Sequence, residues 1–94
     1  MSFDIPSSKI SLDNIKNYIE KTPLKHSERL SKETNSNIFL KLENLQKTGS
    51  FKVRGALNKI LNINRTEKVV AASSGNHGAA VSYALSKKNM IGTI

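Results

Sequence analysis

Hydrophobic residues recur at helical spacing in several stretches of the chain. The clearest stretch predicts a helix from Ser50 to about Ile63. Its apolar stripe consists of Val53, Ala56, Leu57, Ile60 and Leu61. The same spacing predicts a helix over about residues 11–20 and another from residue 78 to about residue 87. The last of these would face inward with Ala80, Val81, Ala84 and Leu85. A short polar helix capped by Ser27 is expected up to residue 35.

Short apolar runs between these helices predict β-strands at residues 38–43 and 69–72. Residues 24–26 read as a short extended piece, and residues 90–94 as the beginning of a strand. An alternation of helices and strands is typical of an α/β protein with a mainly parallel sheet. Because the last strand follows a crossover helix at the end of the sequence, we expect the 94 residues to be the N-terminal portion of a larger α/β protein.

The positive charge of the chain is concentrated in its second half. The formal net charge is +8. Up to Glu43 there are seven basic residues against six acidic ones, and from Asn44 onward there are eight against one. The basic residues are scattered, and no aromatic residues alternate with them as a nucleic-acid stacking platform requires. The charge itself suits an anionic small ligand as well as a polyanion, and we expect most of it to be a solvated surface. We expect no nucleic-acid partner, with a basic nucleic-acid module of strongly salt-dependent affinity as an alternative.

Composition excludes several other classes of protein. Without cysteine there is no disulfide framework and no thiolate metal site, and the two histidines, His26 and His77, are too far apart for metal-ligand spacing. No run approaches the roughly 20 apolar residues of a membrane helix, and no secretory signal is visible. We expect a cytoplasmic protein without a membrane partner.

Lys52 is the first candidate for chemistry. Gly49 permits a turn, Ser50 is a good helix N-cap, and Lys52 follows in the first turn of the predicted helix beside the apolar stripe. Partial desolvation and the positive end of the helix dipole both disfavour the ammonium form there. The resulting amine would be a nucleophile for carbonyls and could form a Schiff base. The alternative is a surface lysine whose stem lies along the helix.

The turn from Ser73 to Gly78 is the second candidate. It follows a strand and opens a helix, so its backbone N–H groups and the helix dipole favour a carboxylate or a phosphate. Ser73, Ser74 and Asn76 add side-chain donors, and glycines 75 and 78 allow close backbone approach. A polar helix cap without a ligand is the alternative. His77 is a candidate acid or base, with a helix-start residue bonded to backbone as the simpler interpretation.

Two further polar residues lie on the face beyond Lys52. Arg54 and Asn58 could bind anions there, or they could be structural or solvent-facing.

The two candidate motifs together resemble the fold type II pyridoxal-phosphate enzymes. A TGSFK-x-RGA helix start at residues 48–56, followed by a strand and then SSGNHG at 73–78, is similar to the branch of threonine/serine dehydratases and serine racemases. Residues 21–27 and 39–46 also resemble that branch, and the likeness extends from about Ile10 to Ile94. The resemblance implies a two-domain, mainly parallel open-sheet fold like that of tryptophan synthase β. Residues 1–66 would belong to the larger, lysine-bearing domain and residues 67–94 would begin the smaller one.

The resemblance also implies a role for each site residue. Lys52 would be the Schiff-base lysine for pyridoxal 5'-phosphate and would then move the substrate α-proton. Phe51 would pack against the cofactor ring, and Asn76 would hydrogen-bond its phenolic oxygen. The substrate carboxylate would be held by Ser73, Ser74, Gly75, Asn76 and His77.

The implied reaction belongs to amino-acid metabolism. It is a lyase reaction in which threonine or serine loses its β-hydroxyl and gives a 2-oxo acid and ammonia. Ser74 matches a second acid/base found on the opposite face of the cofactor in this branch, so an amino-acid racemase is the alternative activity. A non-catalytic binding or structural piece of the same scaffold is the alternative from another class.

Part of the family's machinery has no counterpart in the sequence. The glycine-rich loop for the cofactor phosphate, the residue facing the pyridine nitrogen and the acidic ligands of a divalent cation follow further along in the family. We therefore expect catalysis to need more than these 94 residues, and expect any divalent cation to be bound by residues outside them. The whole protein is expected to be a homo-oligomer acting on a small amino acid.

Overall fold

A computed structural model describes residues 7–94 of the chain. With η denoting a 3-10 helix, the elements are α1 (Ser8–Ile15), η1 (Lys16–Tyr18), β1 (Leu24–His26), α2 (Glu28–Thr34), β2 (Phe39–Lys41), η2 (Glu43–Leu45), η3 (Lys47–Gly49), α3 (Lys52–Asn62), β3 (Val69–Val70), α4 (Asn76–Lys88) and β4 (Gly92–Thr93). Each helix and strand predicted from the sequence is present. The predicted strands are shorter than expected, and the first helix begins earlier and ends as a 3-10 turn.

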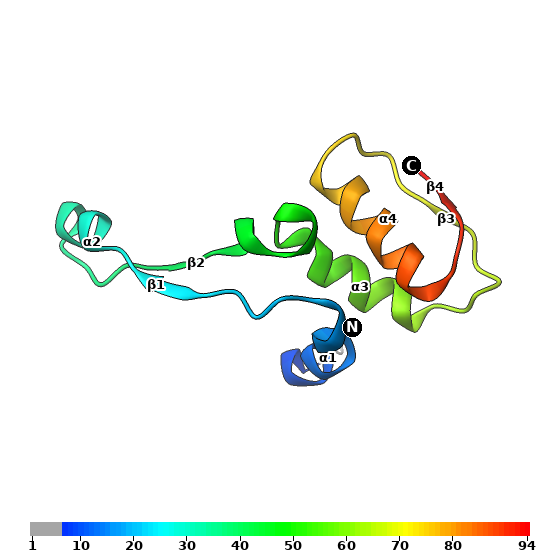
Figure 1. The fold of residues 1–94 in the computed structure, drawn as a ribbon, viewed down its shortest axis with the longest axis horizontal. Helices are drawn as coiled ribbons and strands as arrows, with labels where there is room; N and C mark the ends of the chain where they lie inside the picture. Colours follow the sequence, from blue (N-terminus) through cyan, green and yellow to red (C-terminus); the bar gives the residue numbers. More distant parts are fainter. Residues whose placement is uncertain (1–6) are drawn as a thin grey trace, which may run out of the picture.

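Helices α3 and α4 form the body of the molecule, side by side and running in the same direction (Figure 1). Their facing side chains, together with one residue of α1, make the hydrophobic core: Ile15, Val53, Ala56, Leu57, Ile60, Ala80, Val81, Ala84 and Leu85. Val53 and Leu57 are completely buried. The apolar stripes predicted for the two helices are therefore confirmed, with Leu61 half-buried at the edge of the first stripe.

Strands β3 and β4 lie against α4 and pair in parallel. Val69 is opposite Gly92, and the intervening helix makes the crossover that a parallel pair requires. The fit is close at Gly92, where an added Cβ would lie 2.6 Å from the Leu85 side chain. The parallel pairing predicted for this part of the chain is found.

Strands β1 and β2 form a separate antiparallel ribbon that projects from the body, with α2 at its tip (Figure 1). Ser27 caps α2 by accepting from the Leu30 N–H at 3.3 Å, as predicted, and Asn35 ends the helix in the left-handed conformation. The Ile38 N–H then donates to Ser31 Oγ at 2.8 Å, which starts β2 beside β1. The sequence analysis did not pair these two strands.

The predicted domain division at residue 66 falls between segments that share one core. Helix α3 precedes it and α4 follows it, and their buried side chains are in contact. The Tyr83 hydroxyl also donates to the Tyr18 carbonyl at 2.6 Å, which links α4 to η1. The division into 1–66 and 67–94 stays a prediction, and residues 1–6 of the first unit lie outside the described part of the chain.

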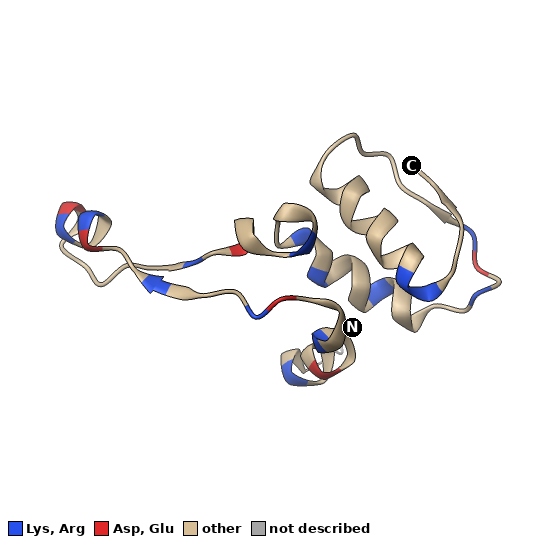
Figure 2. Ribbon diagram, viewed as in Figure 1, with Lys and Arg blue, Asp and Glu red and all other residues tan. Residues whose placement is uncertain are grey.

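Lysine and arginine residues are distributed over the helices, the ribbon and the loops (Figure 2). None of the helices within residues 7–94 combines the length and the hydropathy needed to cross a bilayer.

The Ser73–Gly78 turn packs tightly on the first turn of α4. A Cβ added at Gly78 would lie 2.6 Å from the Ser73 carbonyl oxygen and 3.1 Å from the Ile94 side chain. By contrast, a Cβ at Gly75 would meet nothing within 4 Å. Gly78 is therefore required by the chain's own packing.

Lys88 links the C-terminal ends of α3 and α4. Its ammonium donates to the carbonyls of Ile60 and Leu61, at 3.0 and 3.1 Å, and to that of Ile63. These carbonyls have no partner within α3, because the last turn of a helix leaves its acceptors open. A cation at the negative end of the dipole is also favourable.

Replacing Gly78 with alanine should destabilise the chain because the methyl group overlaps a backbone carbonyl. We expect Gly78→Ala to lower the free energy of unfolding by about 1–3 kcal/mol, measured by urea denaturation. Gly75→Ala is the matched control and should change it by less than about 1 kcal/mol. Equal effects of the two variants would contradict the close packing at Gly78.

Removing the Lys88 ammonium should loosen the α3–α4 pair. We expect Lys88→Met to lower the free energy of unfolding by about 1–2 kcal/mol, because the carbonyls lose a charged donor. Lys59→Met removes an exposed lysine of α3 that makes no hydrogen bond to the described residues, and should cost less than about 0.5 kcal/mol. A loss for Lys88→Met no larger than the control's would contradict the capping role.

Candidate functional site

The parallel packing of α3 and α4 brings the two candidate motifs to one end of the molecule. Lys52 opens α3 and Asn76 opens α4. At this end η3 contacts α4, whereas the Lys88 contacts join the opposite ends of the two helices. The lysine and the Ser73–Gly78 turn therefore lie at the same end of the helix pair (Figure 1).

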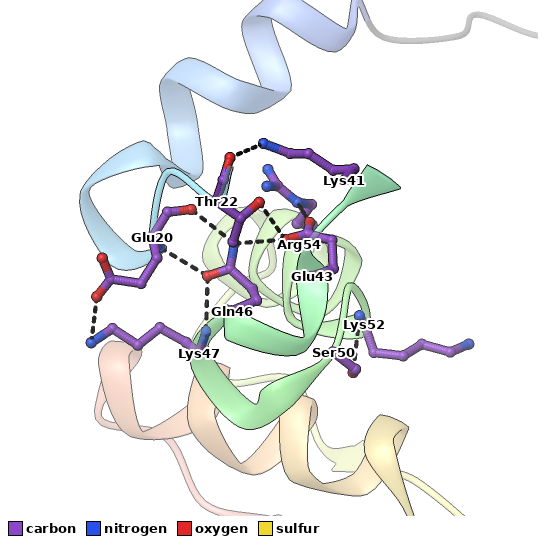
Figure 3. A network of polar contacts seen from close by, with 9 residues as sticks. All are labelled: Glu20, Thr22, Lys41, Glu43, Gln46, Lys47, Ser50, Lys52 and Arg54. Carbon is purple, nitrogen blue, oxygen red and sulfur yellow. Dashed lines mark hydrogen bonds and ion pairs between the residues drawn. The ribbon is translucent and has the colours of Figure 1, made fainter. Parts of the chain in front are cut away.

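Lys52 presents an amine without a partner among the described residues. Its backbone N–H donates to Ser50 Oγ at 3.3 Å, but α3 begins at Lys52 and the residue at its N-cap is Phe51 rather than the predicted Ser50. Its side chain extends away from the neighbouring polar groups, as Figure 3 shows, and its Nζ lies 5.7 Å from the centre of the Phe51 ring. The partial desolvation expected from the sequence is not found, because the Lys52 side chain is exposed.

The Ser73–Gly78 turn has both satisfied and open donors. Ser73 Oγ accepts from the N–H groups of Gly75, the N-cap residue of α4, and of Gly78 in the first turn of α4, at 3.2 and 3.1 Å. The N–H groups of Asn76 and His77 have no acceptor in the described part of the chain. Ser74, Asn76 and His77 are exposed. An anion at this turn would meet open backbone donors and accessible side chains.

His77 is a helix-start residue, as the simpler interpretation predicted, because it lies in the first turn of α4. The expected hydrogen bond from its ring to backbone is not found within residues 7–94. Both helices direct their N-terminal ends here, and each contributes about half a positive charge. Together with the Lys52 ammonium, they make this end of the helix pair favourable for an anionic ligand.

A half-buried carboxylate, that of Glu43, organises the loop that leads to Lys52 (Figure 3). Arg54 Nε binds its Oε1, while Thr22 Oγ1 and Gln46 Nε2 donate to its Oε2 at 3.0 and 3.2 Å. The guanidinium of Arg54 lowers the pKa of the Glu43 carboxyl below its ordinary value of 4.5, against the opposing effect of burial. The stabilisation from this lowered pKa is present above pH 4.5 and is lost as the pH falls through the folded-state pKa.

Gln46 fastens the same loop to the chain before β1. Its amide oxygen accepts from the Glu20 N–H at 2.8 Å and its amide nitrogen donates to the Glu20 carbonyl at 2.9 Å. The side-chain amide thus makes the two hydrogen bonds to the Glu20 backbone that a neighbouring β-strand would otherwise make. Gln46 is 5% exposed, so both ends of its amide need these partners.

Most of this network was not predicted from the sequence. Thr22, Glu43 and Gln46 entered the prediction only as members of the two segments that resemble the family, residues 21–27 and 39–46. For Arg54 it left anion binding and a structural role open, and the pairing with Glu43 confirms the structural role. The signal in the sequence for this network was a run of polar residues on a short loop, and such a run does not show which residues they bind.

The donors at this end fit part of a pyridoxal phosphate site. An exposed primary amine suits an aldehyde, and the open N–H groups of the turn suit the carboxylate of an amino acid. The described residues show no separate cradle for the phosphate. What they provide is an exposed amine of the kind that an aldehyde needs, and a turn whose N–H groups suit a carboxylate.

Comparison with known proteins points to the same chemistry. Residues 15–94 match the family model described as "Pyridoxal-phosphate dependent enzyme". An L-threonine ammonia-lyase of Thermotoga maritima is 52% identical over 73 residues, which is 74% of this chain and 18% of that protein.

Two solved structures share the fold. A threonine deaminase from T.th. has a TM-score of 0.77 at 38% identity, over 92% of this chain and 30% of that one. The serine racemase of Dictyostelium discoideum has a TM-score of 0.82 at 40% identity, over 89% of this chain and 28% of that one. The chain thus spans less than a third of the length of these relatives, and the fold class predicted from the sequence is confirmed. With the family model covering nearly all the described residues, the chain belongs to the family of pyridoxal-phosphate dependent enzymes.

Proposed function

We propose that the whole protein is a dehydratase, or ammonia-lyase, that converts threonine or serine to a 2-oxo acid and ammonia. The observation that carries the proposal is the exposed amine of Lys52 at the same end of the helix pair as the N–H groups of Asn76 and His77, none of which has a hydrogen-bond partner among residues 7–94. An amine for the cofactor and a turn for the substrate carboxylate are the two elements that such a reaction needs first.

The residues of the chain divide this work between the two helices. When bound, pyridoxal 5'-phosphate supplies an aldehyde and an electron sink for charge at the substrate α-carbon. Lys52 on α3 would bind that aldehyde and then, as a free amine, take the α-proton. The Ser73–His77 turn on α4 would orient the carboxylate, with Ser74 and Gly75 beside it. Phe51 would lie against the flat ring, and the Asn76 amide would bind its phenolic oxygen.

The overall reaction balances without a further reactant. Loss of the α-proton and the β-hydroxyl removes one water from the amino acid. The aminoacrylate that is released then hydrolyses to the 2-oxo acid and ammonia, which returns that water. The proton taken by Lys52 is available to the departing hydroxyl.

We also propose that the whole protein is a homo-oligomer.

Replacing Lys52 should abolish the cofactor-dependent reaction. In the complete gene product, we expect Lys52→Ala to lower 2-oxo acid release by about 10²–10⁴-fold, since both the covalent link and the base are lost. Borohydride reduction followed by peptide mapping should place a pyridoxyl adduct on Lys52 in the parent, and none there in the variant. Lys59→Ala, on the exposed face of the same helix, should keep both the activity and the adduct.

A parent protein with no adduct would overturn the enzyme proposal. The chain would then be a non-catalytic member of the family, and the anion bound by the Ser73–Gly78 turn would become the feature to identify.

An amino-acid racemase is the second candidate, favoured by the exposed hydroxyl of Ser74 in the turn. Racemisation needs a second group that returns a proton to the opposite face of the α-carbon. Ser74 lies in the turn before α4, whereas Lys52 opens α3, so the two groups would reach a bound substrate from different segments of the chain.

Loss of the Ser74 hydroxyl should separate the two activities. We expect Ser74→Ala to abolish the loss of chirality of L-serine while 2-oxo acid release stays within about 10-fold of the parent, since general acid–base groups contribute about 10²–10⁴-fold to the step they serve. Ser82→Ala on the exposed face of α4 is the control and should change neither. If Ser74→Ala left racemisation unchanged, Ser74 would not be the second base.

A further inference from the structure

The turn just before Lys52 has a strained backbone. Thr48 has φ 62° and Gly49 has φ 77°, so two consecutive residues are left-handed. This conformation is unfavourable for a β-branched residue such as threonine. In addition, the Thr48 hydroxyl is buried and has no hydrogen-bond partner within residues 7–94. Such a conformation persists only when the surrounding contacts hold it in place.

The contacts on the N-terminal side of this turn come from the chain before β1. The Leu42 N–H donates to the Pro23 carbonyl at 3.0 Å, and the Lys41 ammonium donates to the Thr22 carbonyl at 2.6 Å. The two bonds between Gln46 and Glu20, described above, complete this side. Residues 41–46 are thereby fixed up to the edge of the strained turn.

On the C-terminal side, the contact comes from the first turn of α3. Arg54 is two residues after Lys52, and its Nε binds Glu43 on the other side of the strained turn. Glu43 also accepts from Thr22 and Gln46. Among the side chains described, this carboxylate is where the segment before β1, the loop and α3 are joined (Figure 3).

The ion pair between Glu43 and Arg54 can hold the two segments together, because its surroundings exclude most water. The Glu43 side chain is 16% exposed and that of Arg54 is 30% exposed. The nearby Glu20–Lys47 pair is 55% and 45% exposed and is closer to a surface ion pair, which contributes little. We therefore expect the Glu43–Arg54 pair to hold the two segments in position and the Glu20–Lys47 pair to contribute little.

We propose that Glu43 is a positioning residue that fixes the first turn of α3, and with it the Lys52 amine, by linking Arg54 to Thr22 and Gln46 across the strained Thr48–Gly49 turn. The inference rests on the proposed function, in which the Lys52 amine binds the cofactor aldehyde and takes the α-proton. Glu43 does not contact Lys52. It acts through the backbone, because releasing Arg54 lets the start of α3 move relative to α4 and its turn. A misplacement of about 1 Å can cost about 100-fold in rate.

The test compares two matched glutamate-to-glutamine variants in the complete gene product. Glu43→Gln removes the charge at the joining point, whereas Glu20→Gln removes the charge of the exposed pair and leaves the Glu20 backbone bonds to Gln46 in place. The first measurement is hydrogen exchange of the Lys52 and Arg54 amides, which donate to Ser50 Oγ and the Phe51 carbonyl. The second is the rate of borohydride-trapped pyridoxyl adduct formation at Lys52. The third is the separation of kcat from KM.

For Glu43→Gln we expect at least about 10-fold faster exchange of the two amides, at least about 10-fold slower adduct formation and a lower kcat. KM should stay within about threefold, because the hydrogen bonds of the Glu43 carboxylate go to Thr22, Gln46 and Arg54 and not to the Ser73–Gly78 turn. Glu20→Gln should remain within about twofold of the parent in every measurement. All rates are taken where circular dichroism shows the variants to be folded, so that a smaller folded fraction is not counted as misplacement.

The result that would overturn the proposal is exchange and adduct formation within about twofold of the parent in folded Glu43→Gln. A KM effect equal to the kcat effect would also overturn it, since that outcome indicates general loosening of the site. If Glu43→Gln does not fold, Arg54→Lys carries the same test, because it keeps the charge but lacks the planar Nε donor.

The exchange measurement keeps this inference separate from the proposed function. A parent without an adduct would refute the function, while faster exchange in Glu43→Gln alone would still show that Glu43 fixes the start of α3. A normal adduct in both proteins with unchanged exchange would refute the positioning role and leave the function standing.

Discussion

The direction in which α3 and α4 pack controls the rest of the molecule. Two helices running in the same direction cannot be joined by a tight turn, so the chain between them crosses back along the pair and places β3 beside β4 on the way. Parallel dipoles also oppose each other when side by side. That cost is offset by the buried contacts around Val53 and Leu57 and by the Lys88 ammonium at the negative ends. The parallel packing that brings like dipoles side by side also places both positive helix ends at the candidate site.

The site therefore has two levels of organisation. The helix pair sets the electrostatic environment, which depends only on the N-terminal ends of α3 and α4 lying at the same end of the pair. The loop before α3 sets position, and it does so with short, directional hydrogen bonds rather than with charge alone. The Lys52 amine takes part in neither. Within residues 7–94 its side chain has no hydrogen-bond partner, whereas the residues of the loop before it are extensively bonded.

Local patterns in the sequence were sufficient for the helices but not for the network. The stripe from Val53 to Ile60 and the cap at Ser27 depend on neighbours within a few residues, and both were predicted correctly. The bonds from Thr22 to Glu43 and from Glu20 to Gln46 span 21 and 26 residues, and no local pattern signals such pairs. The β1–β2 ribbon was missed for a related reason, because its short strands are exposed and lack a buried face that would fix their register. The left-handed Thr48 contradicts the preference of its residue type, and only the tertiary contacts around it account for it.

Gln46 is effectively a peptide group carried on a side chain. Its amide matches the main chain of Glu20 in both donor and acceptor, so the position accepts neither a charge nor a shorter amide. Its neighbours Asn44 and Leu45 are exposed and have no comparable requirement. Across proteins that keep this loop, we expect one invariant glutamine between variable neighbours, a pattern set by main-chain complementarity and independent of which substrate the enzyme takes.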